Sequence, residues 1–182
     1  GIFSLLGTSG FWLASAVLRL SVFAWIPVTF GIHDNTTIGI MIMISGVGLI
    51  CGAILTPRLV PPGNRSRIIV AGALMGISLI LLPWVTWLQA ALLLQAVCGG
   101  FGGIYVIPLN AMLQRVGEMT VGTGKIIAIQ NFSENVFMFG GVLCFLAASS
   151  FGVPVAWSMA GNGIVLLGII SCLYWMQKKL KI

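Results

Sequence analysis

The stretch from Gln130 to Asn135 places a carboxylate and several amides inside an otherwise apolar segment. Glu134 is the only formal charge between residues 126 and 148, and a charged residue at the centre of a membrane helix costs roughly 2.5 to 3.5 kcal/mol on insertion scales. On a helix, Gln130 lies one turn from Glu134 and Asn131 lies one turn from Asn135, so two polar stripes run side by side. A carboxylate in this position needs a hydrogen-bonding or charged partner, or a water-filled cavity. A segment with a purely structural role would not need both polar stripes.

A second charge, Arg19, lies well inside the first apolar segment and far from any loop. Because an isolated guanidinium is unfavourable in lipid, we expect Arg19 to face the interior of the helix bundle. Glu134 is the only carboxylate within a predicted helix, since Asp34 and Glu118 fall at segment boundaries or in links. Helix tilt and long side chains would let Arg19 and Glu134 meet.

Two interpretations of this pair stay open. In the first, Arg19 and Glu134 form a buried ion pair that only fixes helix packing. In the second, Arg19 contacts an anionic head group, while Glu134 orients that group or accepts a cation or proton. A buried ion pair seldom adds net stability over apolar packing, which favours the functional interpretation.

Other polar residues join these charges as candidates. Asn110 follows Pro108 closely, so it would either satisfy the carbonyl that the proline frees or line a cavity. His33, the single histidine, is expected to be a boundary residue rather than a ligand. The candidate substrate-binding residues are Arg19, Asn110, Gln130, Asn131, Glu134 and Asn135.

The composition of the 182-residue chain defines its class. Apolar side chains make up 59% and charged ones 7%, and the mean hydropathy is +1.12, so we identify an integral membrane protein. The net charge of +6 comes from basic residues at the ends of apolar runs, which indicate orientation rather than nucleic-acid binding.

The four cysteines lack the spacing of a zinc site or a disulfide framework. No catalytic motif is recognisable, so an intramembrane enzyme is disfavoured and no cofactor or metal is expected.

Six segments are long enough to span a membrane, which takes about 20 apolar residues for roughly 30 Å of hydrocarbon. They cover residues 3–30, 38–56, 68–85, 87–113, 125–148 and 155–177. The second contains Gly48 and Gly52 at a spacing that lets helix backbones approach closely. The fourth contains the glycine cluster from Gly99 to Gly103 and also Pro108, so close packing and a kink are expected there. The expected fold class is an all-α integral membrane bundle of six transmembrane helices.

Basic residues occur in alternate links and predict the orientation. They are Arg58, Arg65 and Arg67 between the second and third segments, Arg115 and Lys125 beside the fourth link, and Lys178, Lys179 and Lys181 in the tail. Since basic residues favour the cytoplasmic side, both termini are expected there, and the six helices fit a three-plus-three inverted repeat. The chain has no initiator Met and no recognisable signal peptide, and it begins at the edge of an apolar segment, which suggests a piece of a longer protein.

The first segment, the stretch GGFGGIYVIPLNAMLQRVGE and above all VGTGKIIAIQNFSEN carry a family likeness. Together they resemble the carboxyl-terminal half of the bacterial lysophospholipid transporter family, within the major facilitator superfamily, over nearly the whole chain. The resemblance implies a twelve-helix protein whose amino-terminal six-helix half is missing here. It implies transport of lysophospholipids, of the lysophosphatidylethanolamine class, across the bacterial inner membrane towards the cytoplasmic leaflet by alternating access. A cytoplasmic-side acyltransferase system would then reacylate them.

The resemblance further implies that Arg19 and Glu134 engage the lipid head group, or a polar network with the missing half. A cavity with few charges and apolar walls suits a lysophospholipid better than a sugar, and membrane lipids are expected around the bundle. Two alternatives stay open: a major facilitator exporter of hydrophobic drugs or other amphiphiles, and a non-transporting membrane scaffold. The polar stripes and Arg19 argue against the scaffold.

Overall fold

The computed structural model describes residues 1–61 and 63–179, and in these residues six helices are long and apolar enough to cross a membrane. They are α1 (Ile2–Phe30), α2 (Asn35–Leu59), α3 (Arg65–Leu81), α4 (Leu88–Met119), α5 (Thr123–Ser150) and α6 (Val155–Lys179), with a short 3-10 helix, η1 (Leu82–Trp84), after α3. The expected all-α membrane fold with six spans is therefore confirmed. Lys181, counted above with the basic tail, lies outside the described residues.

Short polar links set several of the helix ends. Asp34 caps α2, because its carboxylate accepts a hydrogen bond from the Thr37 backbone N–H at 2.8 Å. The Thr37 hydroxyl and then its amide lower the pKa of the Asp34 carboxyl. Asn64 caps α3 by accepting from the Arg67 N–H at 3.2 Å. Gly31 ends α1 with φ of 67°, a left-handed conformation that glycine adopts without strain.

The expected and observed ends differ most at the end of α4. The fourth segment was expected to end at residue 113, but α4 continues to Met119, and α5 begins at Thr123. Hydropathy marks where a helix leaves the membrane, whereas hydrogen bonding determines where it stops. Residues 114–118 are polar enough to predict a link, and the structure shows that they continue the helix instead.

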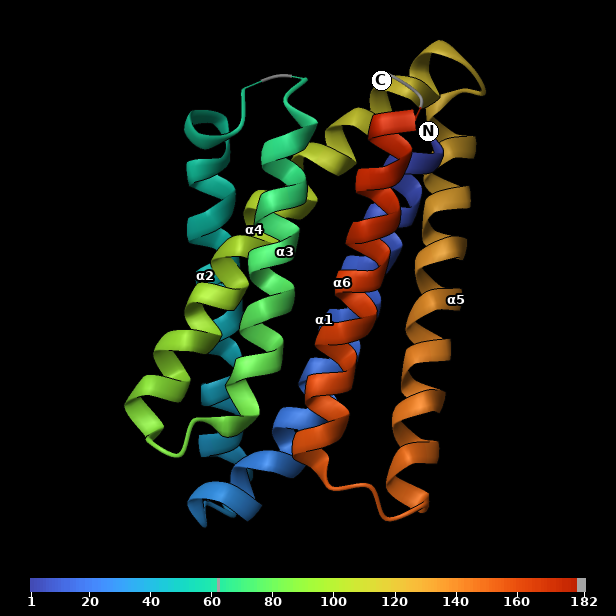
Figure 1. The fold of residues 1–182 in the computed structure, drawn as a ribbon. Helices are drawn as coiled ribbons and strands as arrows, with labels where there is room; N and C mark the ends of the chain where they lie inside the picture. The colour runs from blue at the N-terminus through green and yellow to red at the C-terminus, as the bar shows by residue number, and fades with distance from the viewer. Residues whose placement is uncertain (62, 180–182) are drawn as a thin grey trace.

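The helices form two layers that share one core. Helices α1 and α4 contact each other, with α2 packed along α4 and α5 packed along α1. Helices α3 and α6 pack against each other and against α4 and α1, and α6 lies in front of α1 in the view of Figure 1. Figure 1 shows the start of α1 and the end of α6 at the same end of the bundle, together with the end of α2 and the link from α4 to α5.

The contact between α2 and α4 is the closest in the bundle, as the glycine spacing predicts. A Cβ atom at Gly48 would collide with the carbonyl oxygen of Ala96, and one at Gly52 would collide with that of Gly100. The relation is reciprocal, because Gly99 faces the Ser45 carbonyl and Gly103 faces the Leu49 carbonyl. The two backbones therefore touch directly, in the way that small residues allow between membrane helices.

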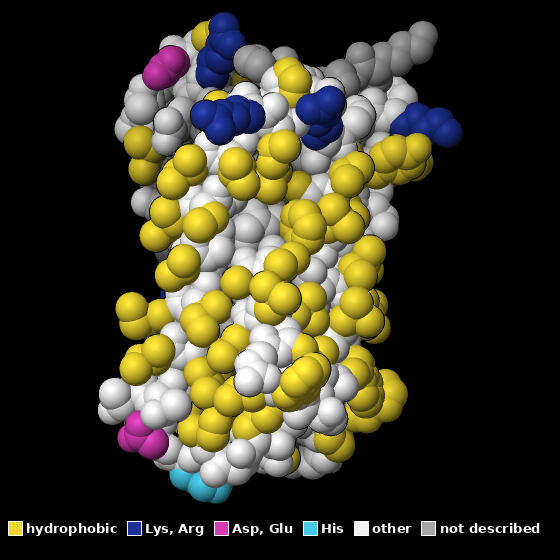
Figure 2. All heavy atoms as spheres, turned by 90° about the vertical axis from the view of Figure 1, so that its left-hand side faces the viewer, with side chains coloured by type: hydrophobic (Ala, Val, Ile, Leu, Met, Phe, Trp, Pro, Cys, Tyr) yellow, Lys and Arg dark blue, Asp and Glu magenta, His cyan; other side chains and the backbone are white. Residues whose placement is uncertain are grey.

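Basic side chains gather at one end of the molecule, above a broad apolar belt (Figure 2). This basic end carries Arg58, Arg65, Arg67, Arg115, Lys125, Lys178 and Lys179, from the ends of α2, α4 and α6 and the starts of α3 and α5. The opposite end carries His33 and Asp34 in the link before α2. The alternation of charge along the sequence thus becomes a separation of charge in space.

Candidate functional site

Helix α5 contacts the rest of the bundle along a narrow seam and exposes most of its surface. Its buried residues are Ile126, Glu134 and Gly141, whose spacing of eight and seven residues places them on one face. Gly117 of α4 leaves room for the Ile126 side chain, and Gly141 lies against side chains of α1. Glu134 therefore lies within the surface by which α5 attaches to α1 and α4.

A polar junction joins α1, α4 and α5 within this seam. The Gln130 Nε2 donates to Asn110 Oδ1 on α4 and to Glu134 Oε1, each at 2.7 Å. Glu134 is only 7% exposed, so the amide supplies a hydrogen bond that solvent does not. One residue before it, the Ser133 hydroxyl shares a hydrogen bond of 2.8 Å with the Ser9 hydroxyl of α1. We call these five residues the polar junction.

The second predicted stripe has a different environment. Asn131 and Asn135 are both exposed, and the Asn135 Nδ2 donates to the Asn131 carbonyl oxygen of the same helix at 2.7 Å. Neither side chain forms a described hydrogen bond to another helix. The two stripes thus separate into a packed one, which holds α5 in place, and an open one, whose amides remain accessible.

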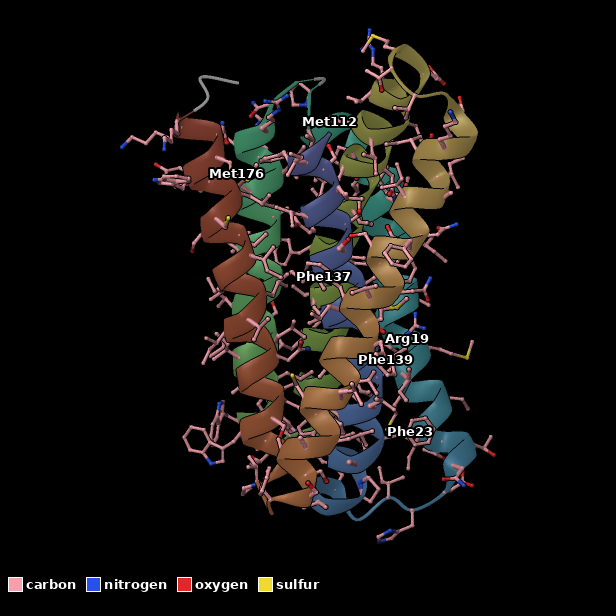
Figure 3. All side chains as sticks on the ribbon, turned by 90° about the vertical axis from the view of Figure 1, so that its right-hand side faces the viewer. Arg19, Phe23, Met112, Phe137, Phe139 and Met176 are labelled. Carbon is pink, nitrogen blue, oxygen red and sulfur yellow. The ribbon has the colours of Figure 1, made fainter. Side chains whose placement is uncertain are left out.

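Arg19 is exposed and lies at the wall of a cavity of about 600 Å³ between α1, α2 and α4. The lining is almost wholly apolar, with Trp12, Ile42, Met43, Ile50 and Met75 among its walls. Figure 3 shows Arg19 and Phe23 of α1 on the same side of the molecule as Phe139 of α5. We call this space the Arg19 cavity. A single guanidinium beside an apolar chamber is suited to a molecule with one anionic group and a long apolar part.

The contacts between α1 and α5 fix the relative depth of their residues. Ser9 meets Ser133, and farther along both helices Val17 lies against Gly141. The two helices therefore run parallel, with eight residues separating the two contact points on each. A residue on one helix can be matched in depth to its neighbour on the other.

This register separates Arg19 from Glu134. Arg19 lies ten residues beyond Ser9 on α1, which is about 15 Å of helix rise, whereas Glu134 lies one residue beyond Ser133. Side chains lean towards the N-terminus of their own helix, so on parallel helices both lean the same way. The expected pairing of Arg19 with Glu134 is wrong, and Arg19 borders the Arg19 cavity instead. The described donor to the carboxylate is Gln130.

Sequence reasoning found Gln130 and Glu134 but missed their neighbour across the helix contact. Ser9 carries little signal, because a serine in an apolar helix usually bonds to its own backbone. The apolar lining of the Arg19 cavity was also missed, since Met43 and the other lining residues look like ordinary lipid-facing or core side chains. Among the residues that the structure describes, no group of three or more His, Cys, Asp or Glu side chains could hold a metal ion.

Comparison with known proteins identifies a set of similar transporters. The chain is 37% identical over 94% of its length to the lysophospholipid transporter LplT of Photorhabdus laumondii, of which it covers 43%. It is 38% identical over 97% of its length to the proteins of that name from Cronobacter sakazakii and Klebsiella pneumoniae, of which it covers 45%. No family model matches the chain, and no solved structure matches it.

These relatives are named as transporters and not as enzymes, in agreement with the absence of a catalytic motif. The chain spans less than half the length of the curated relatives that it matches. Six helices that can cross a membrane account for nearly all of that matching region. The resemblance seen in the sequence is confirmed, and this chain is a homologue of part of the bacterial lysophospholipid transporters.

Proposed function

We propose that this chain is the carboxyl-terminal six-helix half of a major facilitator transporter that moves lysophospholipids, of the lysophosphatidylethanolamine class, across the bacterial inner membrane. The observation that carries the proposal is the position of Arg19 beside the Arg19 cavity. The relatives' printed name gives the substrate class, and the cavity has the chemistry that such a substrate needs.

Arg19 would bind the phosphate of the substrate. A guanidinium presents a planar set of donors that matches phosphate oxygens, and it stays charged at any working pH. The cavity beside it has room and apolar walls for an acyl chain, with the aromatic rings of Phe11 and Trp12 among them. One phosphate and one chain would therefore be held by neighbouring parts of the same helix, α1.

The polar residues of α5 would line the path that the head group follows. Asn131 and Asn135 offer exposed amides, and the Glu134 carboxylate lies beside them in the seam. In a six-helix bundle surrounded by lipid, these amides and Arg19 would face hydrocarbon, which is unfavourable. A second set of helices that covers this face would enclose them in a shared path and permit alternating access.

The separation of charge supports an orientation. Basic residues favour the cytoplasmic side of a membrane, so we place the basic end in the cytoplasm and the end with His33 and Asp34 outside. Transport towards the basic end would then deliver a lysophospholipid to the cytoplasmic leaflet. A cytoplasmic-side acyltransferase system would be the partner that consumes it.

The test is transport by a complete twelve-helix protein. The chain is joined to the amino-terminal half of the Klebsiella relative and reconstituted in vesicles, and uptake of labelled lysophosphatidylethanolamine is measured. We expect uptake by the joined protein and none by this chain alone. Arg19→Gln should reduce uptake at least tenfold, because a charge-assisted hydrogen bond to phosphate is lost.

The controls separate this function from its competitors. Arg115→Gln removes an exposed arginine at the basic end, outside the cavity, and should leave uptake within about twofold. The intact relative shows that the assay works. Uptake of a cationic hydrophobic dye in place of the lysolipid would indicate a drug exporter. No uptake of either compound by a folded, inserted protein would indicate a scaffold. Either of these two results would reject the proposal.

A further inference from the structure

We infer that Arg19 and Glu134 act one after the other at two depths of the same path, and do not form one head-group site. The inference rests on the proposed function and specifies how the two charges share the work. It replaces the ion pair that the sequence suggested. The register of α1 against α5 carries it.

The backbones of the two residues are separated, along the helix axes, by more than the length of the head group. The contact of Ser9 with Ser133 places the Glu134 backbone about 14 Å closer to the basic end than the Arg19 backbone, along the helix axes. In phosphoethanolamine, four bonds link the phosphorus to the nitrogen. They span roughly 5 Å, judging from the 3.8 Å that three backbone bonds cover between Cα atoms. The head group is much shorter than this backbone separation, so we place its phosphate at Arg19 and its ammonium at Glu134 at different times.

Arg19 and Glu134, which we call the two stations of the path, have different chemistry. Arg19 is exposed and borders an apolar cavity, so it suits the phosphate that every lysophospholipid carries. Glu134 is buried, and of the described residues Gln130 is its hydrogen-bond donor. A carboxylate has room for several hydrogen bonds, so Glu134 can also accept one from an ammonium group. A head group without an ammonium gains nothing there.

The order of the stations follows from their depth. Glu134 lies closer to the basic end than Arg19 does, because the start of α5 is at that end. A substrate that moves towards the basic end meets Arg19 first and Glu134 later. Arg19 should then govern capture of all lysophospholipids alike, and Glu134 should govern a later step for those with an ammonium group.

The experiment measures KM and the maximal transport rate of the joined twelve-helix protein for lysophosphatidylethanolamine and lysophosphatidylglycerol. Arg19→Gln should raise KM about tenfold for both lipids. Glu134→Gln should lower the maximal rate at least fivefold for the ethanolamine lipid, change it less than twofold for the glycerol lipid, and keep both KM values within twofold. Exchange of the charges, with Arg19→Glu and Glu134→Arg together, should not restore transport.

Matched variants keep the outcome interpretable. Glu118→Gln removes an exposed carboxylate at the basic end and should change neither parameter. Arg19→Lys and Glu134→Asp keep each charge and should show smaller effects of the same kind, even where the neutral variants fold poorly. Equal increases in KM from both neutral variants, or rescue by charge exchange, would overturn the two-station inference. Absence of transport by the unmodified protein would instead reject the proposed function.

Discussion

At the scale of single residues, the Gln130 side chain connects two helices, because it forms hydrogen bonds to residues of both α4 and α5. Both N–H bonds of its amide are used, one towards Asn110 on α4 and one towards the Glu134 carboxylate. Its Nε2 therefore has no hydrogen left for a substrate. We interpret Gln130 as a residue that positions α5 and its carboxylate, whereas the exposed Asn131 and Asn135 keep the lining role proposed for them.

The first prediction concerns this amide. Gln130→Leu removes the hydrogen-bond donor and leaves an apolar side chain in its place. The Glu134 carboxylate and the Asn110 side-chain oxygen Oδ1 then lose their partner. A buried polar group without a hydrogen bond costs about 1–3 kcal/mol, and we expect the free energy of unfolding to fall by that amount. Thermal unfolding of the purified protein in mild detergent measures the change.

Asn135→Leu is the matched control for Gln130→Leu. It removes an amide from the same helix, but this amide is exposed and bonds only to the backbone of its own helix. We expect its thermal unfolding midpoint to equal that of the parent protein within experimental error. Equal midpoints for the two variants would show that the hydrogen bonds to Asn110 and Glu134 do not hold α5 in place.

The sequence predicts which residues of this site are polar, but it cannot predict how the helices align. The four-residue spacing of Gln130 and Glu134 implies their shared face correctly. The Arg19 pairing was inferred from depth counted along each segment, with tilt left free. Depth is set by the contact of Ser9 with Ser133, and two serines give no signal of that contact before the helices are packed.

At the scale of helices, the bundle has one rigid contact and one narrow one. A Cβ atom added at Gly48, Gly52, Gly99 or Gly103 would collide with a backbone carbonyl of the neighbouring helix. Because the backbones of α2 and α4 are in direct contact, these two helices should move together. Helix α5 has only three buried positions along its length. If parts of this bundle move relative to one another during transport, the seam is the contact with least to lose.

The second prediction compares two glycines of α2. Gly48→Ala places a methyl group against the Ala96 carbonyl oxygen, and backbone cannot move aside as a side chain can. We expect it to lower the free energy of unfolding by about 1–3 kcal/mol, the usual effect of overpacking. Unfolding in increasing sodium dodecyl sulfate, followed by tryptophan fluorescence, measures the difference.

Gly46→Ala provides the comparison within the same helix. A Cβ at Gly46 would have nothing within 4 Å, and alanine is the better helix former by about 1 kcal/mol. We expect this variant to be as stable as the parent or slightly more stable. If Gly48→Ala behaved in the same way, the two backbones would not lie in contact.

Element positions were the easiest part to predict, because length and hydropathy decide which segments can cross a membrane. The close approach at Gly48 and Gly52 was also predictable, since only small residues permit it. The end of α4 was not, because the polar residues from Gln114 to Glu118 continue the helix beyond the membrane. Polarity marks the water boundary, and helices can extend through that boundary.

At the scale of the whole molecule, polar groups lie where a lone bundle would meet lipid. Arg19, Asn131 and Asn135 are exposed, whereas the face turned to the viewer in Figure 2 carries a broad apolar belt. The relatives are more than twice as long as the matching region. Both facts fit a bundle that presents one face to further helices and the remainder to lipid.

The last prediction concerns orientation. His33 and Lys178 are exposed and lie at opposite ends of the bundle, beside the start of α2 and at the end of α6. Each is replaced by cysteine, as His33→Cys or Lys178→Cys, in a protein whose four cysteines are changed to alanine. A thiol reagent that cannot cross membranes is added to bacterial spheroplasts, and labelling is measured before and after permeabilisation.

We expect His33→Cys to be labelled at once and Lys178→Cys only after permeabilisation, because the charge asymmetry places the basic end in the cytoplasm. The parent without cysteines measures the background. The reverse pattern would place the basic end outside. Transport towards the basic end would then carry lysophospholipid away from a cytoplasmic acyltransferase, and the proposed direction would fail even if the substrate class were right.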